Sequence, residues 1–172
     1  MNQKMRAEMK ITETIFRNKI KPIFAKAVFA SIATVNEEGH AHVSPIGSVV
    51  VLSKDNGIYF EKFTKSIPKN IKKDDIATIM VVNTGRWFWL KSLIKGQFES
   101  PPAIRLVVKM GQLKEADVNE MTIFKRKVAL FKKTTGYKQL WQDMSMVREF
   151  SIVDYKPIYL GHMTRKQFAV SE

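Results

Sequence analysis

The sequence contains no cysteine, which excludes disulfides, thiolate catalysis and cysteine-ligated zinc or iron–sulfur centres. It also lacks an apolar run of the ~18 residues that a membrane-spanning helix requires. The first nine residues mix charges of both signs and lead into no apolar stretch, so they do not resemble a signal peptide. We therefore expect a soluble protein of the cytoplasm that does not enter a membrane.

Two glycine motifs that bind phosphate groups are missing as well. None of the eight glycines forms a GxG pair, and no GxxxxGK[ST] loop is present. The glycines of these motifs let the backbone approach a phosphate closely. Their absence argues against a Rossmann dinucleotide-binding fold and against a P-loop nucleotide-binding protein.

Acidic residues are few, with 16 Asp and Glu against 29 Lys and Arg, for a net charge of +13. A field of this sign attracts nucleic acid, an acidic membrane surface or a phosphorylated small molecule. Much of the positive charge lies in two runs, residues 62–73 and residues 125–138. The charge by itself does not select one of these partners.

The length and composition favour one domain over residues 1–172. A chain of 172 residues with 45% hydrophobic side chains can bury one sizeable core. No repeat, low-complexity tract or linker divides it.

Three segments are expected to be helical. Residues 11–26 have partly helical spacing of isoleucines, and Pro22 is expected to end or kink this helix. Residues 66–75 predict a short helix with Ser66 as its N-cap. Asp117 and Glu120 have the spacing of a capping box and begin an amphipathic helix over residues 117–133. Residues 86–96 are compatible with either a strand or a short helix.

Most of the remaining chain predicts about seven short strands, and the first of them, joined by tight turns, predict an antiparallel meander. Strands with little βαβ alternation predict a mainly β fold, an antiparallel barrel decorated by helices. The expected strands are residues 28–35, 41–53, 58–63, 76–83, 103–113, 146–154 and 156–163.

A candidate phosphate site lies where the strand 58–63 runs into the short helix. Thr64 and Ser66 offer hydroxyl groups, Lys65 offers an ammonium group, and the first helical turn offers backbone N–H groups. Lys69, one turn further on, could add a second cation. On the residues alone, an equally good interpretation is that Ser66 only caps a helix whose lysines are solvated.

A series of short motifs over residues 29–82 resembles the FMN-binding split barrels of the pyridoxamine 5′-phosphate oxidase-like family. The resemblance implies a split β-barrel with α-helices and FMN as the cofactor. The motifs stand in the same order as in the family and are Ala33-Thr34, Gly39 through Pro45, Tyr59-Phe60, Thr64-Lys65-Ser66 and Lys69-Asn70-Ile71.

Carried over position by position, the resemblance assigns the FMN phosphate to Lys65 and Ser66, with Thr64, Lys69 and Asn70 nearby. It assigns no catalytic side chain and no metal ligand. It implies a homodimer with the cofactor at the interface, in which residues 87–89 (Trp-Phe-Trp) are candidates to pack against the partner. It places the flavin ring against Ser44, Pro45, Ile46, Gly47, Ser48 and Val49.

The implied function is a flavin-dependent oxidoreductase that acts on an unidentified small molecule. Two departures argue against a true pyridoxamine-phosphate oxidase: residues 48–52 carry no arginine, and the Arg-Leu-x-Pro-like ending of those enzymes is missing. Members of the superfamily bind haem or the deazaflavin F420 instead, so either is an alternative cofactor on the same fold.

Two other functions have weaker signals. His40 and His42 share a face of one strand but have no evident third ligand, so no metal site is expected. His162 is a candidate axial ligand only if the cofactor is haem. The basic residues 125–133 keep a nucleic-acid-binding module as an alternative, although a solvated helix face explains them better.

Overall fold

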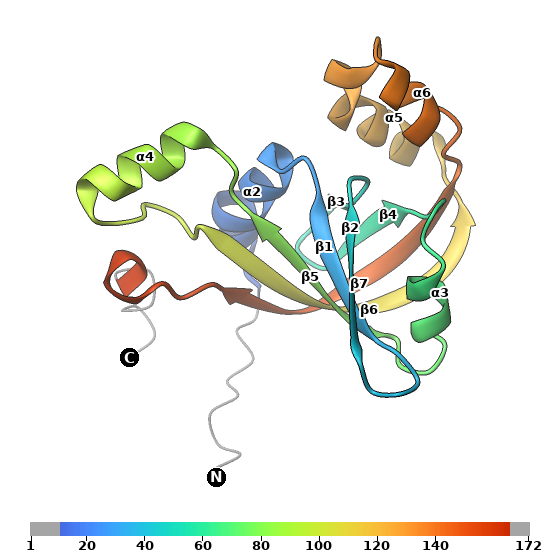
Figure 1. The fold of residues 1–172 in the computed structure, drawn as a ribbon, viewed down its shortest axis with the longest axis horizontal. Helices are drawn as coiled ribbons and strands as arrows, with labels where there is room; N and C mark the ends of the chain where they lie inside the picture. The colour runs from blue at the N-terminus through green and yellow to red at the C-terminus, as the bar shows by residue number, and fades with distance from the viewer. Residues whose placement is uncertain (1–10, 166–172) are drawn as a thin grey trace.

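The structure is a computed structural model that describes residues 11–165, and its centre is one seven-stranded antiparallel sheet (Figure 1). The order of strands across the sheet is β2-β1-β5-β6-β7-β4-β3. The strands are β1 (Ala30–Val35), β2 (Ala41–Ile46), β3 (Val50–Val51), β4 (Asn56–Phe60), β5 (Ile76–Val82), β6 (Ala103–Glu115) and β7 (Met146–Pro157).

The helices lie at the ends and on one face of this sheet (Figure 1). Helix α4 projects at one end, whereas α5 and α6 form a separate layer at the other end. The helical segments are α1 (Glu13–Ile15), the π-helix η1 (Phe16–Ile20), α2 (Lys21–Lys26), α3 (Ser66–Asn70), α4 (Arg86–Lys95), α5 (Val118–Lys127), the 3-10 turn η2 (Ala129–Phe131), α6 (Thr135–Leu140) and the 3-10 turn η3 (Gly161–Thr164).

The two longest strands bend the sheet into a split barrel. The pairing of β6 with β7 shifts register between Val107 and Val108 and again between Met110 and Leu113. An extra residue in one strand bends that strand and increases its twist. Strand β6 can therefore pair with β5 over residues 103–109 and stay paired with β7 as far as Glu115. The expected mainly β split barrel is confirmed.

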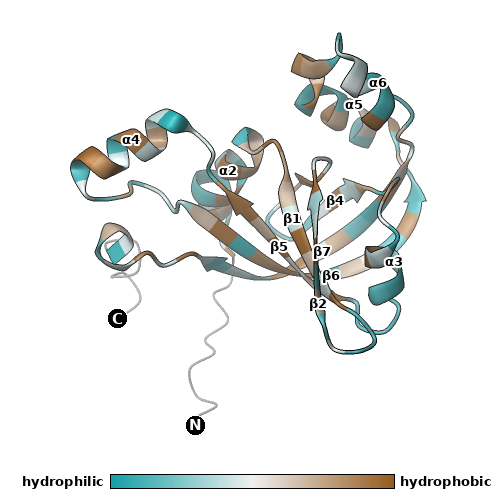
Figure 2. Ribbon diagram, viewed as in Figure 1, coloured by the Kyte–Doolittle hydropathy of each residue, from teal (hydrophilic) through white to brown (hydrophobic). Residues whose placement is uncertain are grey.

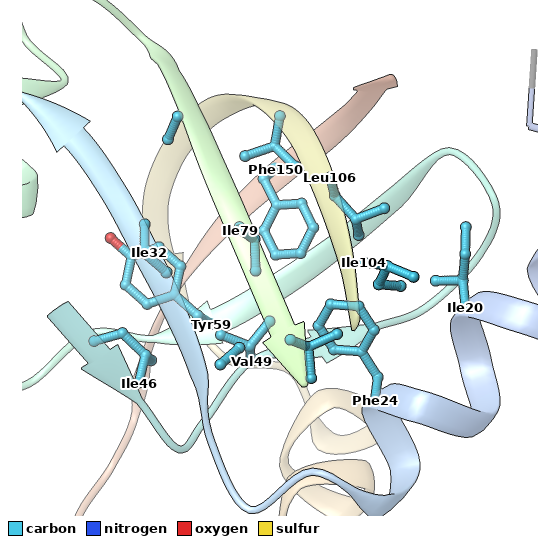
Figure 3. Close-up of a cluster of buried hydrophobic side chains, with 14 of the residues drawn as sticks. Ile20, Phe24, Ile32, Ile46, Val49, Tyr59, Ile79, Ile104, Leu106 and Phe150 are labelled. Atoms are coloured by element: carbon cyan, nitrogen blue, oxygen red, sulfur yellow. The ribbon is translucent and has the colours of Figure 1, made fainter. Parts of the chain in front are cut away.

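The core lies between the concave face of the sheet and the N-terminal helical segment. Ile20 and Phe24 point toward strands that contribute Ile104, Leu106 and Phe150 (Figure 3). Each of these side chains is buried, and burying one such side chain stabilises a fold by about 1.5–3 kcal/mol. Figure 2 shows hydrophobic residues along β1 and β5 at the centre of the sheet, and also on α4.

Of the two effects predicted for Pro22, ending or kinking the first helix, the first does not occur. The chain stays helical from Glu13 to Lys26, with a π-helical turn just before the proline. The N–H of Lys21 bonds to the carbonyl of Phe16, five residues back. Pro22, which has no N–H, then falls in the first turn of α2, where an unpaired position is tolerated.

The predicted meander is wrong, because the expected strand 41–53 divides into two. Strand β2 pairs with β1 at one end of the strand order, and β3 pairs with β4 at the other end. Residues 47–49 separate them, and the Ser48 side chain bonds to the backbone of Phe60. The Ser48 hydroxyl therefore occupies the N–H and carbonyl of Phe60, which a continuous strand would have bonded through its own backbone.

Two further boundaries differ from the expectations, at β7 and at α5, and one open alternative is decided. Strand β7 is continuous through Tyr155, and no separate strand follows in residues 158–165. The ambiguous segment 86–96 is the helix α4, which Gly96 ends in a left-handed conformation (φ 63°). The capping box of Asp117 and Glu120 is confirmed, but α5 ends at Lys127 and not at residue 133.

Within residues 11–165 no helix is both long enough and apolar enough to cross a membrane.

Candidate functional site

A cavity of about 280 Å³ opens where β2 ends and β4 leaves the sheet. This volume is near the lower limit of the roughly 300–1,000 Å³ typical of ligand pockets. We call it the barrel-edge cavity. It brings Thr64 next to four of the residues to which the resemblance assigned the flavin ring. Its lining is Val28, Phe29, Pro45, Ile46, Gly47, Ser48, Phe60, Lys62, Phe63, Thr64, Leu140, Trp141 and Met144.

Ser48 fixes the backbone that forms one wall of the barrel-edge cavity. Its buried hydroxyl donates to the carbonyl of Phe60 at 2.9 Å and accepts from the N–H of Phe60 at 3.1 Å. Both hydrogen-bonding roles of the hydroxyl are therefore filled within the protein. Ser48 holds the turn after β2 against the end of β4, and the backbone of this turn, not the Ser48 hydroxyl, is presented to a ligand.

Aromatic rings form the other walls. Phe29, Phe60, Phe63 and Trp141 come from three separate segments of the chain and line the same space. Trp141 packs directly over Gly47, where an added Cβ would stand 3.5 Å from the indole Cζ2. Flat apolar rings of this kind suit a planar heteroaromatic ligand.

Thr64 contributes an unused polar atom. Its Oγ1 is buried and has no hydrogen-bond partner among the described residues. A buried hydroxyl left unpaired costs free energy, so this oxygen favours a ligand that can bond to it. The neighbouring Lys65 is exposed, and within the described chain its ammonium has no hydrogen bond or ion pair.

The sequence predicted Ser66 as the N-cap of α3, and this prediction is wrong. The cap position is Lys65, which makes no capping side-chain bond, and Ser66 is the first helical residue. The strand β4 ends at Phe60, and the helix begins one residue earlier than expected.

The other predicted residues lie outside the lining of the cavity. Asn70 donates to the Thr34 hydroxyl at 2.9 Å in a buried contact, and Lys69 lies 3.9 Å from Glu37. Both contacts tie α3 to β1 and its hairpin. Ser44 lies 3.5 Å from a ring nitrogen of His42, and the carbonyl of Val49 accepts from the Lys127 ammonium at 2.6 Å.

These residues fit FMN in part. The barrel-edge cavity supplies aromatic walls, backbone from residues 45–48 and a hydroxyl at Thr64 that has no partner among the described residues. Lys65 and Ser66 follow Thr64 in the chain but are not part of the lining. The side chains of Ser48 and Asn70 are occupied in holding the fold. The phosphate contacts would therefore come from Thr64, Lys65 and Ser66.

The pyridoxamine 5′-phosphate oxidase family profile matches residues 16–154 of this sequence, which include every strand up to β7. The chain belongs to this family. No curated protein matches the chain.

Several solved structures share this fold. An FMN-binding protein from Syntrophomonas wolfei subsp. wolfei superposes with a TM-score of 0.60 at 18% identity, covering 86% of this chain and 89% of that one. HupZ from Group A Streptococcus gives 0.54 at 14% identity, covering 81% and 90%. An F420 reductase gives 0.53 at 7% identity, covering 79% and 94%. At these identities the likeness establishes the split-barrel fold.

The sequence did not single out the helical layer that closes the cavity in this family member. Leu140 is the last residue of α6, and Trp141 and Met144 follow that helix. All three lie far along the chain from residues 45–48. Trp141 also contacts Phe131, with ring centroids 5.6 Å apart. An aromatic residue between a short helix and a strand gives no signal of this contact, because the sheet order brings the segments together.

A buried polar network lies beside the site. Arg148 donates to Glu61 through Nε (2.8 Å) and through its terminal nitrogen (3.0 Å), and it also donates to the carbonyl of Gly111. The Tyr59 hydroxyl donates to the same carboxylate. Burial, and then the adjacent Glu61 carboxylate, raise the pKa of Tyr59 far above its usual range. This phenol stays protonated and structural.

Four cations of the helical layer surround a second, wider hollow of about 620 Å³. Lys125 and Arg126 come from α5, Lys132 follows η2, and Lys138 comes from α6. No acidic residue lines this hollow. The solvated basic face that the sequence predicted is thus concave.

The histidines form no metal site within residues 11–165, where no three potential ligands gather. His40 lies 3.3 Å from the exposed carboxylate of Glu38. His162 is exposed in η3 and does not line the barrel-edge cavity.

Proposed function

We propose that this family member binds FMN in the barrel-edge cavity and acts as a flavin-dependent oxidoreductase on a small molecule. The observation that carries the proposal is the buried, unpartnered hydroxyl of Thr64 in a cavity walled by residues 45–48 and by aromatic rings. The fold likeness to an FMN-binding protein supports the same cofactor.

Each part of the cavity would have its own role in binding FMN. Thr64 and Lys65 would hold the phosphate, since charge-assisted hydrogen bonds to a phosphate are the strong ones. The backbone of the turn after β2 would face the polar edge of the ring, and Trp141 and Phe63 would exclude water from its face. Bound FMN supplies transfer of an electron pair, and the protein supplies position and electrostatics.

The substrate differs from that of pyridoxamine-phosphate oxidase. Residues 48–52 carry no arginine, and three of them are the valines 49–51. Strand β3 and the turn before it therefore offer no guanidinium to a phosphorylated substrate. We propose a small molecule without a phosphate group as the substrate.

An absorbance scan followed by an FMN titration tests the cofactor. The purified chain should show the flavin bands, or quench FMN fluorescence at stoichiometric ratio after reconstitution. A Soret band, or the spectrum of a deazaflavin, would replace FMN with haem or F420. Steep salt-dependent retention of DNA by a colourless protein would instead favour the nucleic-acid-binding module.

Matched variants test the phosphate contacts. Lys65→Ala should weaken FMN binding by about tenfold or more, because a charge-assisted hydrogen bond contributes about 1.5–3 kcal/mol. Thr64→Val should weaken it several-fold. The control is Lys72→Ala, which removes the same charge from an exposed position beyond the C-terminal end of α3, whereas Lys65 stands at the N-terminal end next to Thr64.

Riboflavin, which lacks the phosphate, separates phosphate contacts from ring contacts. Its affinity should stay the same in Lys65→Ala and in Thr64→Val. Equal effects of Lys65→Ala and Lys72→Ala on FMN would remove Lys65 from the site, and equal effects on FMN and riboflavin would remove the phosphate assignment.

We infer that the protein is a homodimer and that α4 contributes to the interface. Trp87 is 82% exposed and Ile94 is 77% exposed on this helix. They lie seven residues apart, on one face with Leu90. Phe88 and Trp89 instead pack against Phe98. Of the three aromatic residues expected at the interface, Trp87 is therefore the one available to a partner.

A further inference from the structure

A third cavity, of about 350 Å³, lies between α2, β3 and α5, and we call it the Lys127 cavity. It has no lining residue in common with the barrel-edge cavity. Ser48 lines the barrel-edge cavity, and the next residue, Val49, lines the Lys127 cavity. The lining of the Lys127 cavity is Lys21, Phe24, Ala25, Val49, Val50, Val51, Ile123, Arg126 and Lys127.

Lys127 places an uncompensated positive charge in this cavity. Its ammonium has one hydrogen bond within the described chain, to the carbonyl of Val49 at 2.6 Å. An ammonium has three donors, so two remain available. Burial lowers the pKa of Lys127 to about 8, and no neighbouring carboxylate offsets this effect. A buried charge is ordinarily paired, because an unpaired one costs several kcal/mol.

The rest of the lining defines what could pair with Lys127. The two other charged residues, Lys21 and Arg126, are also cations, and no acidic residue lines the cavity. All the remaining lining residues are apolar. The cavity is thus positive at one side and hydrocarbon elsewhere, which favours a ligand with one anionic group and an apolar body.

We propose that the Lys127 cavity binds a small monovalent organic anion, of the carboxylate class, with its charged group against Lys127 and its apolar part against β3 and α2. Phosphate alone would leave the apolar walls unfilled. A neutral ligand of the same shape would leave the ammonium unpaired. Val49 is the one residue that this site shares with the set assigned to the flavin ring. The site has no lining residue in common with the barrel-edge cavity, where FMN is proposed to bind.

Octanoate is a suitable probe for the full-length chain, with 1-anilinonaphthalene-8-sulfonate as the fluorescent reporter that it displaces. Octanoate should displace the reporter, whereas octanol and inorganic phosphate at the same concentration should not. Failure of octanoate to displace the reporter, or equal displacement by octanol, overturns the proposal. These measurements use the unaltered protein, so they do not depend on the folding of a variant.

Substitutions then locate the site. Lys127→Met keeps the length of the side chain and should weaken octanoate about tenfold, the effect of losing one charge-assisted hydrogen bond. Lys125→Met, on the same helix but outside this cavity, should have no effect. Equal weakening by the two variants means that the overall positive charge holds octanoate, which overturns the proposal.

Two further variants separate this cavity from the barrel-edge cavity. Val51→Phe fills the Lys127 cavity from β3 and should abolish octanoate binding while FMN titrates as before. Lys65→Ala should leave octanoate binding unchanged. Loss of octanoate binding in Lys65→Ala would place the probe in the FMN cavity and overturn the proposal. Failure of the protein to bind FMN would overturn the proposed cofactor and leave the Lys127 cavity proposal standing.

Discussion

Two buried hydroxyl groups have no hydrogen-bond partner among residues 11–165, and their surroundings give them different meanings. Thr64 lines a cavity, so a ligand can satisfy its oxygen. Tyr155 lies within the main hydrophobic core, and burial raises its pKa to about 12. The first hydroxyl points to a binding site, and the second only costs stability.

Tyr155→Phe should therefore raise the free energy of unfolding by about 1 kcal/mol, because it removes an unpaired polar atom from the core and keeps the ring. Tyr59→Phe is the matched control and should lower it, since the Tyr59 hydroxyl donates to Glu61. Urea unfolding of the two variants measures both effects. A loss of stability in Tyr155→Phe would mean that its hydroxyl has a partner, such as a buried water.

Lys127 should make the stability depend on pH in the alkaline range. Its pKa is about 8 in the folded state against an ordinary 10.5, so the unfolded state binds more protons between these values. Stability relative to Lys127→Met should therefore be lowest below pH 8 and rise by up to about 3 kcal/mol as the pH reaches 10.5. Lys21 and Arg126 face the same cavity and remain in both proteins.

Urea unfolding at pH 7, 9 and 10 without added anion measures this difference. Lys125→Met, compared in the same way, should show no such rise. A difference that stays constant over this pH range would mean that the Lys127 ammonium is well solvated.

At the scale of elements, β4 depends on a close approach that only glycine allows. A Cβ on Gly57 would overlap the ring of Phe150 and stand 2.6 Å from the carbonyl of Val50. Both neighbours belong to strands that pair with β4. Because Gly57 has no Cβ, Val50 of β3 and the Phe150 ring of β7 can both lie close to the backbone of β4.

Gly57→Ala should lower the free energy of unfolding by about 1–3 kcal/mol, the usual cost of overpacking. Gly136→Ala is the control, because its Cβ would meet only the Thr134 hydroxyl, at 3.9 Å, and alanine favours the helix α6. In thermal unfolding, the midpoint temperature should fall for Gly57→Ala and rise for Gly136→Ala. Equal stability of Gly57→Ala and the unaltered protein would show that Phe150 can move aside.

The ion pair of Glu61 and Arg148 joins the end of β4 to β7. The two side chains are 8% and 12% exposed. Removing one partner of a buried pair leaves the other charge uncompensated. This pair therefore holds the strand next to the barrel-edge cavity in place.

Glu61→Gln should lower the free energy of unfolding by about 3–5 kcal/mol, as measured by chemical denaturation. Glu99→Gln breaks the exposed pairs with Lys91 and Lys95 and should change little. A small effect of Glu61→Gln would mean that the Gly111 carbonyl and water satisfy Arg148.

At the scale of the whole molecule, the proposed homodimer depends on the exposed apolar face of α4. Sedimentation equilibrium should give twice the mass of one chain, and the double change Trp87→Glu with Ile94→Glu should give the single mass. Leu130→Glu, at a 93% exposed apolar position in η2, is the control and should stay dimeric. A monomeric unaltered protein, or a dimeric double variant, would exclude α4 as the interface.

The sequence by itself located most of the strands and helices and identified the family by resemblance, but it left residues 86–96 open. Short apolar runs located β1, β5 and β6, the spacing of Asp117 and Glu120 located the start of α5, and a series of short motifs identified the split barrel. These signals are local: each depends on side chains a few residues apart, which meet in any structure that contains the element.

Only the tertiary structure decided which strands are neighbours and what closes the cavities. It separated β2 from β3 across the sheet, placed Trp141 over Gly47, and put Lys127 against the carbonyl of Val49. Neither residue 127 nor residue 141 has a local pattern that points to its partner. The physical reason is that burial and charge compensation depend on all the segments that pack around a residue, and the fold brings those segments from distant parts of the chain.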